Sequence, residues 1–172
     1  MLEDAREVAR AHRHALRERR HPFDVGRRQI AHGGDPFEMG SARPLDYGHW
    51  SAHKLEGLTS HELRHGEAVA IGLALDTRYS VQIGMLAAGA EDRVYRLLKR
   101  LGFYLWHPAM ETRDEQGRLA ILRGIEEFRE HLGGELTITL LRDIGRGEEV
   151  HAMDNNEILH AKIGRASCRE RG

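Results

Sequence analysis

His49 and His53 are four residues apart in a segment that we expect to be helical, so both imidazoles would lie on one face of the helix, and Glu56 follows on that face. Two imidazoles at this spacing can bind one metal ion. The chain has 12 histidines in 172 residues, however, and His61 with His65 forms a second pair at the same spacing. Because such pairs also arise by chance, the first pair by itself is compatible with ordinary surface residues.

His65 adds a third imidazole in a context that favours a site. It is followed by Gly66, which allows a ligand or another backbone to approach closely, and it precedes an apolar segment, residues 68–75. Catalytic zinc sites usually take three protein ligands and leave one position for water or substrate. The donor types therefore predict a divalent metal ion, with zinc suiting imidazoles completed by a carboxylate and iron or cobalt also compatible.

Two consecutive helices must position these histidines. Asp46 is expected to cap the first, which carries residues 47–56 and ends at Gly57. Thr59 and Glu62 have capping-box spacing and predict a second helix from about residue 60 to 83. The middle of this second helix is apolar on every side, which is typical of a buried helix, so we expect it at the centre of a helical bundle.

The rest of the chain predicts a mainly α domain with one short β element near its C-terminus. Helical spacing of apolar residues and changes of period give the following expected elements: helices over 91–100 and from Thr112 to about residue 132, a strand over 135–141, an extended piece from Val150 and a last helix opened by Asp154.

Composition excludes several functional classes. The net charge is −1, which offers no overall attraction to nucleic acid or anionic lipid. No apolar run has the length of a membrane span, and the first twenty residues are charged throughout, unlike a signal peptide. One cysteine excludes a disulfide framework. We therefore expect a cytoplasmic protein that binds neither nucleic acid nor membrane.

The chain divides into three parts by sequence. Residues 1–28 are rich in arginine and histidine and are left unassigned, because a solvated helix and a displaced reading frame explain them equally well. Residues 29–162 form the expected domain. Residues 163–172, which contain Cys168, resemble translated read-through of a sequencing adapter; a basic tail is the alternative. We interpret this last segment as non-native and exclude it from the fold.

Two blocks of the sequence resemble the C-terminal half of the 3-dehydroquinate synthase superfamily. These are Gly-His-x-x-x-His-x-x-Glu, at residues 48–56, and His-Gly-Glu-x-Val-x-Ile-Gly, at residues 65–72, with 16 residues from His49 to His65. The segment over 134–141 is similar to the closing strand of the family. The resemblance covers about residues 29–162 and implies the helical C-terminal domain of a dehydroquinate-synthase-like fold.

The resemblance also implies roles for individual residues. His49 and His65 would be metal ligands, and His53 would be a substrate-facing group that handles a proton or contacts phosphate. Glu56 has two alternative roles, an ion-pair residue or a metal ligand, and the ion pair is the more common role for such a residue. Glu67 would stabilise the first turn of its helix through its negative charge, and it could contact a metal-binding side chain without binding the metal itself.

Three further residues correspond to substrate-binding positions of the family: Arg43, Asp46 and Arg129. Typical dehydroquinate synthases have Asn where this chain has Asp46, and an Asp-Lys-Lys segment near residues 128–131, where this chain has Phe-Arg-Glu-His. These departures place the chain closer to a bacterial sugar-cyclase-like branch and argue against dehydroquinate as the product.

In the family, bound NAD transiently oxidises a substrate hydroxyl, phosphate leaves, and the ring closes by aldol addition without net oxidation. The NAD-binding half and a third metal ligand, a glutamate, would precede the expected domain. The prediction is therefore a C-terminal fragment of a metal- and NAD-dependent sugar phosphate cyclase, a lyase that is inactive alone and whose full form is a possible homodimer acting on a small sugar phosphate. The alternatives are a fragment of a related iron- or zinc-dependent alcohol or polyol phosphate dehydrogenase, and a non-enzymatic helical module.

Overall fold

The computed structural model describes residues 46–161, which form five α-helices, two short 3-10 helices and a two-stranded sheet. In chain order the elements are α2 (His49–Leu58), α3 (His65–Gln82), α4 (Glu91–Arg100), η3 (Pro108–Glu111), η4 (Ala120–Leu122), α5 (Arg123–His131), β1 (Ile138–Asp143), β2 (Arg146–Val150) and α6 (Asn155–Ala161). Arg43 and the predicted boundaries at residues 28 and 162 lie outside the described residues. The mainly α fold with a small β element confirms the predicted class.

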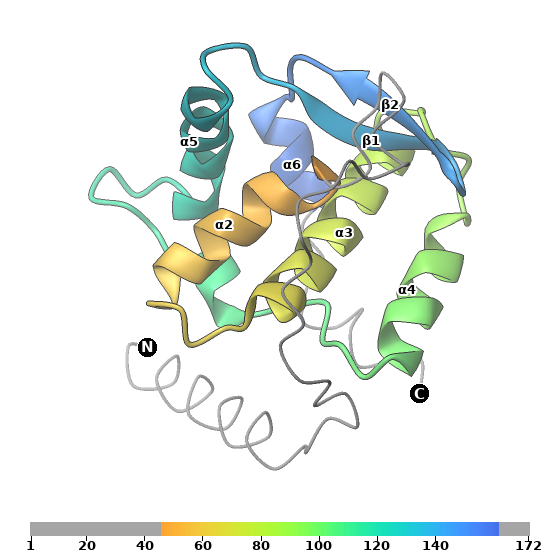
Figure 1. The fold of residues 1–172 in the computed structure, drawn as a ribbon, viewed down its shortest axis with the longest axis horizontal. Helices are drawn as coiled ribbons and strands as arrows, with labels where there is room; N and C mark the ends of the chain where they lie inside the picture. The colour runs from red at the N-terminus through yellow and green to blue at the C-terminus, as the bar shows by residue number, and fades with distance from the viewer. Residues whose placement is uncertain (1–45, 162–172) are drawn as a thin grey trace, which may run out of the picture. The chain divides into compact units, whose positions relative to one another are not determined.

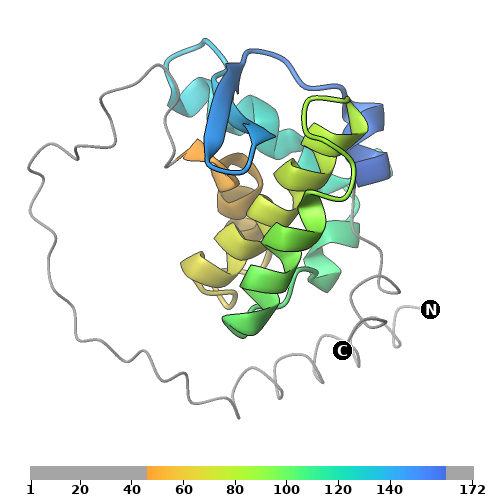
Figure 2. The same cartoon turned by 90° about the vertical axis from the view of Figure 1, so that its right-hand side faces the viewer.

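Helix α3 is the central element. It contacts α2, α4, α6 and β1, so other elements surround it on most sides (Figures 1 and 2). Its middle, residues 68–75, is buried or half-buried throughout, and Ile71 is 1% exposed. The all-apolar sequence of this segment explains its position, because no side of it gains from contact with water. The prediction of a buried central helix is confirmed.

The two strands form an antiparallel hairpin in which Ile138 lies opposite Val150. Ile138 and Leu140 are fully buried and belong to the main hydrophobic core, whereas β2 is exposed or half-buried. The hairpin lies across one end of the helices (Figure 1). The strand expected over 135–141 begins three residues later than predicted, and the second extended piece ends at Val150 rather than beginning there. The alternating pattern located β1, but it gave no signal for the polar strand β2.

Helix α3 begins at His65, five residues later than predicted. Ser60 and His61 have φ values of 51° and 60°, so the chain makes a left-handed turn after α2. The capping box lies at the next possible position, where the Glu67 carboxylate accepts a hydrogen bond of 3.0 Å from the backbone N–H of Arg64. The capping box that starts the helix therefore uses the second of two successive glutamates, each of which is placed to bond the backbone N–H three residues earlier.

The helix predicted from Thr112 also begins later, at Arg123. Asp114 accepts hydrogen bonds from the backbone N–H groups of Gln116 and Arg118, at 3.0 and 2.9 Å, and so closes a turn. Aspartate commonly bonds the backbone in this way, in competition with helix formation.

The predictions for α4 and α6 are confirmed, and Asp154 caps α6 by accepting from the Asn156 N–H at 2.7 Å. Within residues 46–161, no helix combines the length and hydrophobicity that crossing a membrane requires.

Candidate metal centre between α2 and α3

Helices α2 and α3 meet with their backbones in direct contact. A Cβ atom added to Gly72 would lie 2.0 Å from the carbonyl oxygen of Gly48, and a Cβ on Gly48 would lie 2.6 Å from the backbone nitrogen of Leu73. Gly48 also has a φ of +79°, a conformation that favours glycine. Only glycine at both positions allows this approach, which sets the distance between the two helices that carry the histidines.

Asp76, on α3, holds the start of α2. Its carboxylate is fully buried and accepts hydrogen bonds from the backbone N–H of Gly48 at 2.9 Å and the indole N–H of Trp50 at 2.8 Å, so it binds the residues on both sides of His49. Burial raises the pKa of Asp76 to about 7, against the opposing effect of these two donors. We did not predict this residue as part of the site, although a single acidic residue in an apolar helix was the available signal.

Asp46 does not cap α2 as predicted. The N-cap residue is Gly48, and no side chain caps the helix there. The carboxylate of Asp76, distant in sequence, binds the Gly48 N–H instead. Asp46 lies close enough to His49 for its negative charge to act on that imidazole. It therefore remains beside the metal centre, and its role in substrate binding stays a prediction.

The imidazole rings of His49, His53 and His65 come together at the α2–α3 junction. The ring centroids are 5.4 Å apart for His49 and His65, 5.7 Å for His49 and His53, and 5.9 Å for His53 and His65. Zinc–nitrogen bonds of about 2.0–2.1 Å place the rings of two ligands at similar separations. The expected convergence of the three rings is thus present, while the role of each ring stays a prediction.

His49 is the least exposed of the three histidines, and its surroundings shift its pKa. Burial lowers its pKa most, the hydrogen bond to the Tyr47 carbonyl and the charge of Asp46 act in the opposite direction, and the two neighbouring imidazoles lower it further. Its Nδ1 lies 3.2 Å from the Tyr47 carbonyl oxygen. A neutral imidazole that donates from Nδ1 keeps the lone pair of Nε2 available for a metal ion.

Glu56 connects the other two histidines. Its Oε2 lies 3.1 Å from Nδ1 of His65 and 3.5 Å from Nδ1 of His53. The Glu56 side chain is 14% exposed, whereas those of both histidines are 55% exposed. Among the described residues, these three form a group whose potential ligand atoms all lie within 4.8 Å of one another.

A hollow of about 280 Å³ lies beside His53, between α2 and α5, and is lined by Trp50, His53, Lys54, Gly124, Glu127, Phe128 and His131. The rings of His53 and Phe128 are stacked, 6.4 Å apart with an angle of 25° between them. His131 was not a predicted site residue, although it belongs to the segment over 128–131 that departs from the family pattern. The hollow therefore leaves space for part of a small molecule beside His53.

Arg129 is not among the residues that line this hollow. It forms an ion pair with Glu126, one turn earlier on α5, at 2.8 Å. The structure thus brings His49, His53 and His65 together and places Arg129 on an exposed part of α5. Its predicted contact with substrate stays a prediction.

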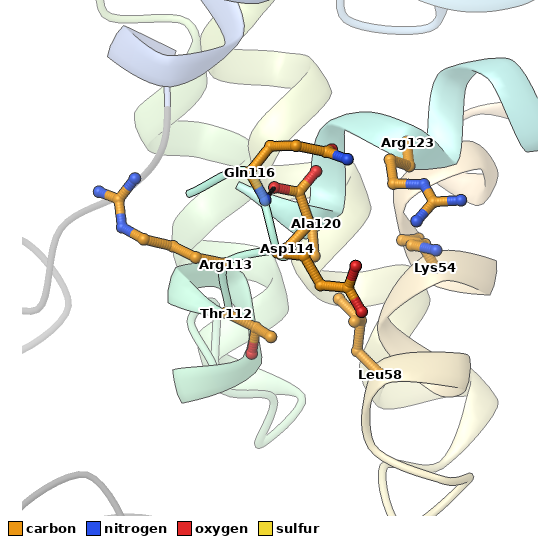
Figure 3. Close-up of a pocket in the computed structure, with 9 residues that line it drawn as sticks. Lys54, Leu58, Thr112, Arg113, Asp114, Gln116, Ala120 and Arg123 are labelled. Atoms are coloured by element: carbon orange, nitrogen blue, oxygen red, sulfur yellow. Dashed lines mark hydrogen bonds between the residues drawn. The ribbon is translucent and has the colours of Figure 1, made fainter. Parts of the chain in front are cut away.

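A second, polar groove of about 390 Å³ opens on the other side of Lys54, along the turn over 112–116. Figure 3 shows the side chains of Arg123 and Lys54 on one side of this groove and Asp114 and Gln116 on the other. Lys54 pairs with Glu127 at 2.5 Å, and Asp114 pairs with Arg118. Two charged residues that line the groove, Lys54 and Asp114, are thus already paired. The three histidines do not line it.

The family described as "3-dehydroquinate synthase C-terminal" matches residues 6–120. The chain belongs to this family. The match includes both histidine blocks and also part of the segment over 1–28 that its composition left unassigned. Membership of the superfamily, and of its C-terminal part, confirms the predicted resemblance.

Curated members of the family are similar over most of this chain. A 3-dehydroquinate synthase of Aeropyrum pernix is 34% identical over 72% of this chain and 33% of its own length. A 2-epi-valiolone synthase of Actinosynnema mirum is 38% identical over 76% of this chain and 34% of its own length. The chain spans about a third of the length of the curated relatives it matches. These names support the predicted cyclase family.

A solved structure has the same fold. ValA, a 2-epi-5-epi-valiolone synthase from Streptomyces hygroscopicus subsp. jinggangensis 5008 with NAD+ and Zn2+ bound, is 26% identical, with a TM-score of 0.60 over 68% of this chain and 31% of that protein. The family therefore includes a member that binds both a metal ion and NAD+.

The described residues fit a zinc ion but not NAD+. The half-buried imidazole of His49, whose pKa is lowered by burial, and the neighbouring ring of His65 are donors that zinc prefers. The only strands within residues 46–161 form an antiparallel hairpin, whereas dinucleotide sites of the doubly wound kind need a parallel strand, a glycine-rich turn and a helix.

Proposed function

We propose that this chain supplies the metal-binding C-terminal part of a sugar phosphate cyclase. Such an enzyme eliminates phosphate from a sugar phosphate and closes a carbon ring by an intramolecular aldol addition. The observation that carries the proposal is the convergence of His49, His53 and His65 at the junction of α2 and α3, beside a hollow large enough for part of a small substrate.

In this proposal His49 and His65 hold a divalent ion, with zinc favoured and cobalt or iron as alternatives. The ion would supply Lewis-acid polarisation of a substrate oxygen. The hydrogen bond from His49 to the Tyr47 carbonyl orients that ring. NAD+ would be bound by residues outside those described.

His53 has a different role in this proposal. It is half exposed, lines the hollow and has Phe128 stacked against its ring. An imidazole can take up and release protons near neutral pH. In this position His53 would exchange a proton with the substrate or bind its phosphate, while Phe128 restricts the orientation of the ring.

The substrate is proposed to differ from that of the 3-dehydroquinate synthases. Asp46 lies next to His49 where those enzymes have asparagine, and His131 lines the hollow within the segment where they carry lysines. The similarity to a 2-epi-valiolone synthase and to ValA also supports a substrate of the sugar-cyclase branch.

A full-length protein carrying these residues provides the test. Incubated with NAD+, Zn2+ and a panel of sugar phosphates, it should release inorganic phosphate without net formation of NADH. Accumulation of NADH in proportion to turnover would instead identify a dehydrogenase and refute the proposal. His53→Ala should lower kcat by at least about 100-fold, the usual contribution of a proton-transferring group.

His160→Ala is the matched control, because His160 is an exposed histidine on α6, away from the junction of α2 and α3. We expect this variant to retain the activity of the unmodified protein. An equal loss of activity in both variants would show that removal of a histidine acts through stability and not through the site.

A further inference from the structure

Glu56 is the least exposed member of the group that contains His53 and His65. One of its oxygens, Oε2, faces Nδ1 of both histidines, at 3.1 Å from His65 and 3.5 Å from His53. The shorter distance is that of a hydrogen bond between an imidazole N–H and a carboxylate. The longer one is an ion-pair contact one turn away on the same helix.

We infer that Glu56 is a positioning residue that holds His65 in the tautomer with the proton on Nδ1. In this tautomer the lone pair lies on Nε2, the nitrogen that points away from the carboxylate. A carboxylate behind a metal-binding histidine fixes the orientation of the ring and raises its basicity. This inference rests on the proposed function, in which His65 is a metal ligand.

The same arrangement is present at His49, although its acceptor is different. Nδ1 of His49 faces the backbone carbonyl of Tyr47 at 3.2 Å, and Nδ1 of His65 faces Glu56 at 3.1 Å. Each of the two rings thus has an oxygen acceptor at Nδ1 and keeps Nε2 for another partner. The two ring centroids lie 5.4 Å apart, the shortest separation among the three pairs.

A direct metal ligand is the competing role for Glu56. The ligand set would then be Oε2 of Glu56 with Nδ1 of His53 and Nδ1 of His65, and His49 would be left out of it. The arrangement at His49 argues against this set, because its half-buried ring has an oxygen acceptor at Nδ1 and so keeps Nε2 for a metal ion. The two roles predict opposite effects of replacing His49 and His53.

The first experiment measures the tautomer of His65 in the metal-free chain by long-range ¹H–¹⁵N NMR correlations of the imidazole. We expect the proton on Nδ1 in the unmodified chain. Glu56→Ala should return His65 to the tautomer mixture of an exposed imidazole, and Glu56→Gln, whose carbonyl still accepts a hydrogen bond, should keep part of the Nδ1–H form. Glu130→Ala, at an exposed glutamate of α5, is the control and should change nothing. A proton on Nε2 in the unmodified chain would overturn the inference.

The second experiment measures zinc affinity by titration calorimetry on the same variants. Glu56→Ala should weaken zinc binding by about 10- to 100-fold, the usual effect of removing the partner of a ligand, and Glu56→Gln by less. His49→Ala should abolish binding and His53→Ala should leave it within about threefold. Loss of binding in His53→Ala with retention in His49→Ala would show that Glu56 is a ligand, and the inference would be wrong.

The two experiments separate the inference from the proposed function. If the unmodified chain does not bind zinc, the proposed metal centre is wrong. The NMR measurement of the His65 tautomer still decides whether Glu56 positions that ring. Circular dichroism and thermal unfolding of each variant show whether the fold is retained, and the near-isosteric Glu56→Gln variant serves if Glu56→Ala does not fold.

Discussion

Gly72 and Gly48 are the residues at which the backbones of α2 and α3 touch. Gly72→Ala would place a methyl group 2.0 Å from the Gly48 carbonyl oxygen, which is a backbone atom and cannot move aside alone. We expect a loss of at least about 3 kcal/mol in the free energy of unfolding, at the upper end of the usual cost of overpacking. Urea unfolding followed by circular dichroism measures it.

Gly66→Ala is the matched control for this prediction. Gly66 lies in the first turn of the same helix, and an added Cβ there meets nothing within 4 Å. Alanine favours a helix over glycine by up to about 1 kcal/mol, so this variant should be as stable as the unmodified chain or slightly more stable. Equal stability of the two variants would contradict the close contact of α2 and α3.

Asp76 predicts a dependence of stability on pH. Its pKa is about 7 in the folded chain, raised by burial, against an ordinary value of 3.8. Between these values the folded state keeps a proton that the unfolded state has lost, so the contribution of Asp76 to stability falls as the pH rises through this window. The loss is complete above about pH 7 and amounts to about 4 kcal/mol, at 1.36 kcal/mol per pH unit.

Asp76→Asn isolates this contribution, since asparagine does not titrate while the histidines titrate in both proteins. We expect the stability of the unmodified chain, relative to Asp76→Asn, to be about 2–3 kcal/mol more favourable at pH 5 than at pH 8. The asparagine has one acceptor for two donors, but this cost is the same at both pH values. Parallel stability profiles for the two proteins would show that burial does not raise the pKa of Asp76.

At the scale of elements, the stability of the domain depends on the burial of α3. Ile71, at 1% exposed, belongs to the main core, whereas Leu73 is only half-buried. Ile71→Asp would bury an unpaired charge and should prevent recovery of soluble, folded protein. Leu73→Asp should be milder, because water reaches part of that side chain.

Leu97→Asp, on α4, is the control for this prediction, because the Leu97 side chain is 57% exposed. Its yield of soluble protein and its melting temperature should match those of the unmodified chain. Recovery of folded Ile71→Asp protein in similar amounts would show that α3 is peripheral to the fold.

At the scale of the whole molecule, the chain corresponds to about a third of its curated relatives. In the proposed site, His49 and His65 would provide two of the three protein ligands that a catalytic zinc site normally uses. We therefore expect this chain alone to bind Zn2+ weakly, with a dissociation constant in the micromolar range or above, and to show no cyclase activity with added NAD+. A preformed ligand set would bind much more tightly.

Titration calorimetry with Zn2+ and a phosphate-release assay on the purified chain test this expectation. Tight binding that is lost in His53→Ala would show that His53 completes the ligand set, in conflict with its proposed role in proton transfer. Cyclase activity of the chain alone would show that it needs no further domain.

The sequence by itself determined the elements that depend on local signals. The all-apolar segment over 68–75 predicted a buried central helix, apolar spacing with Gly102 predicted α4, and Asp154 predicted the start of α6, all of which are present. The spacing of His49, His53 and His65 on two consecutive helices also predicted that their rings would meet. The helices were predictable because the signals that form them lie within a few residues along the chain, and the meeting of the rings was predictable because a short turn joins the two helices.

Only the tertiary structure decided how the site is held together. The starts of α3 and α5 depend on competition between neighbouring capping and turn signals, which their sequence patterns do not rank. Asp76 reaches Gly48 across 28 positions, and Glu56 reaches His65 across nine, through the crossing of two helices. The contact of Asp76 with Gly48 lies at the close approach of Gly48 and Gly72, and the geometry of that crossing follows from packing between segments distant in the chain, to which no local pattern responds.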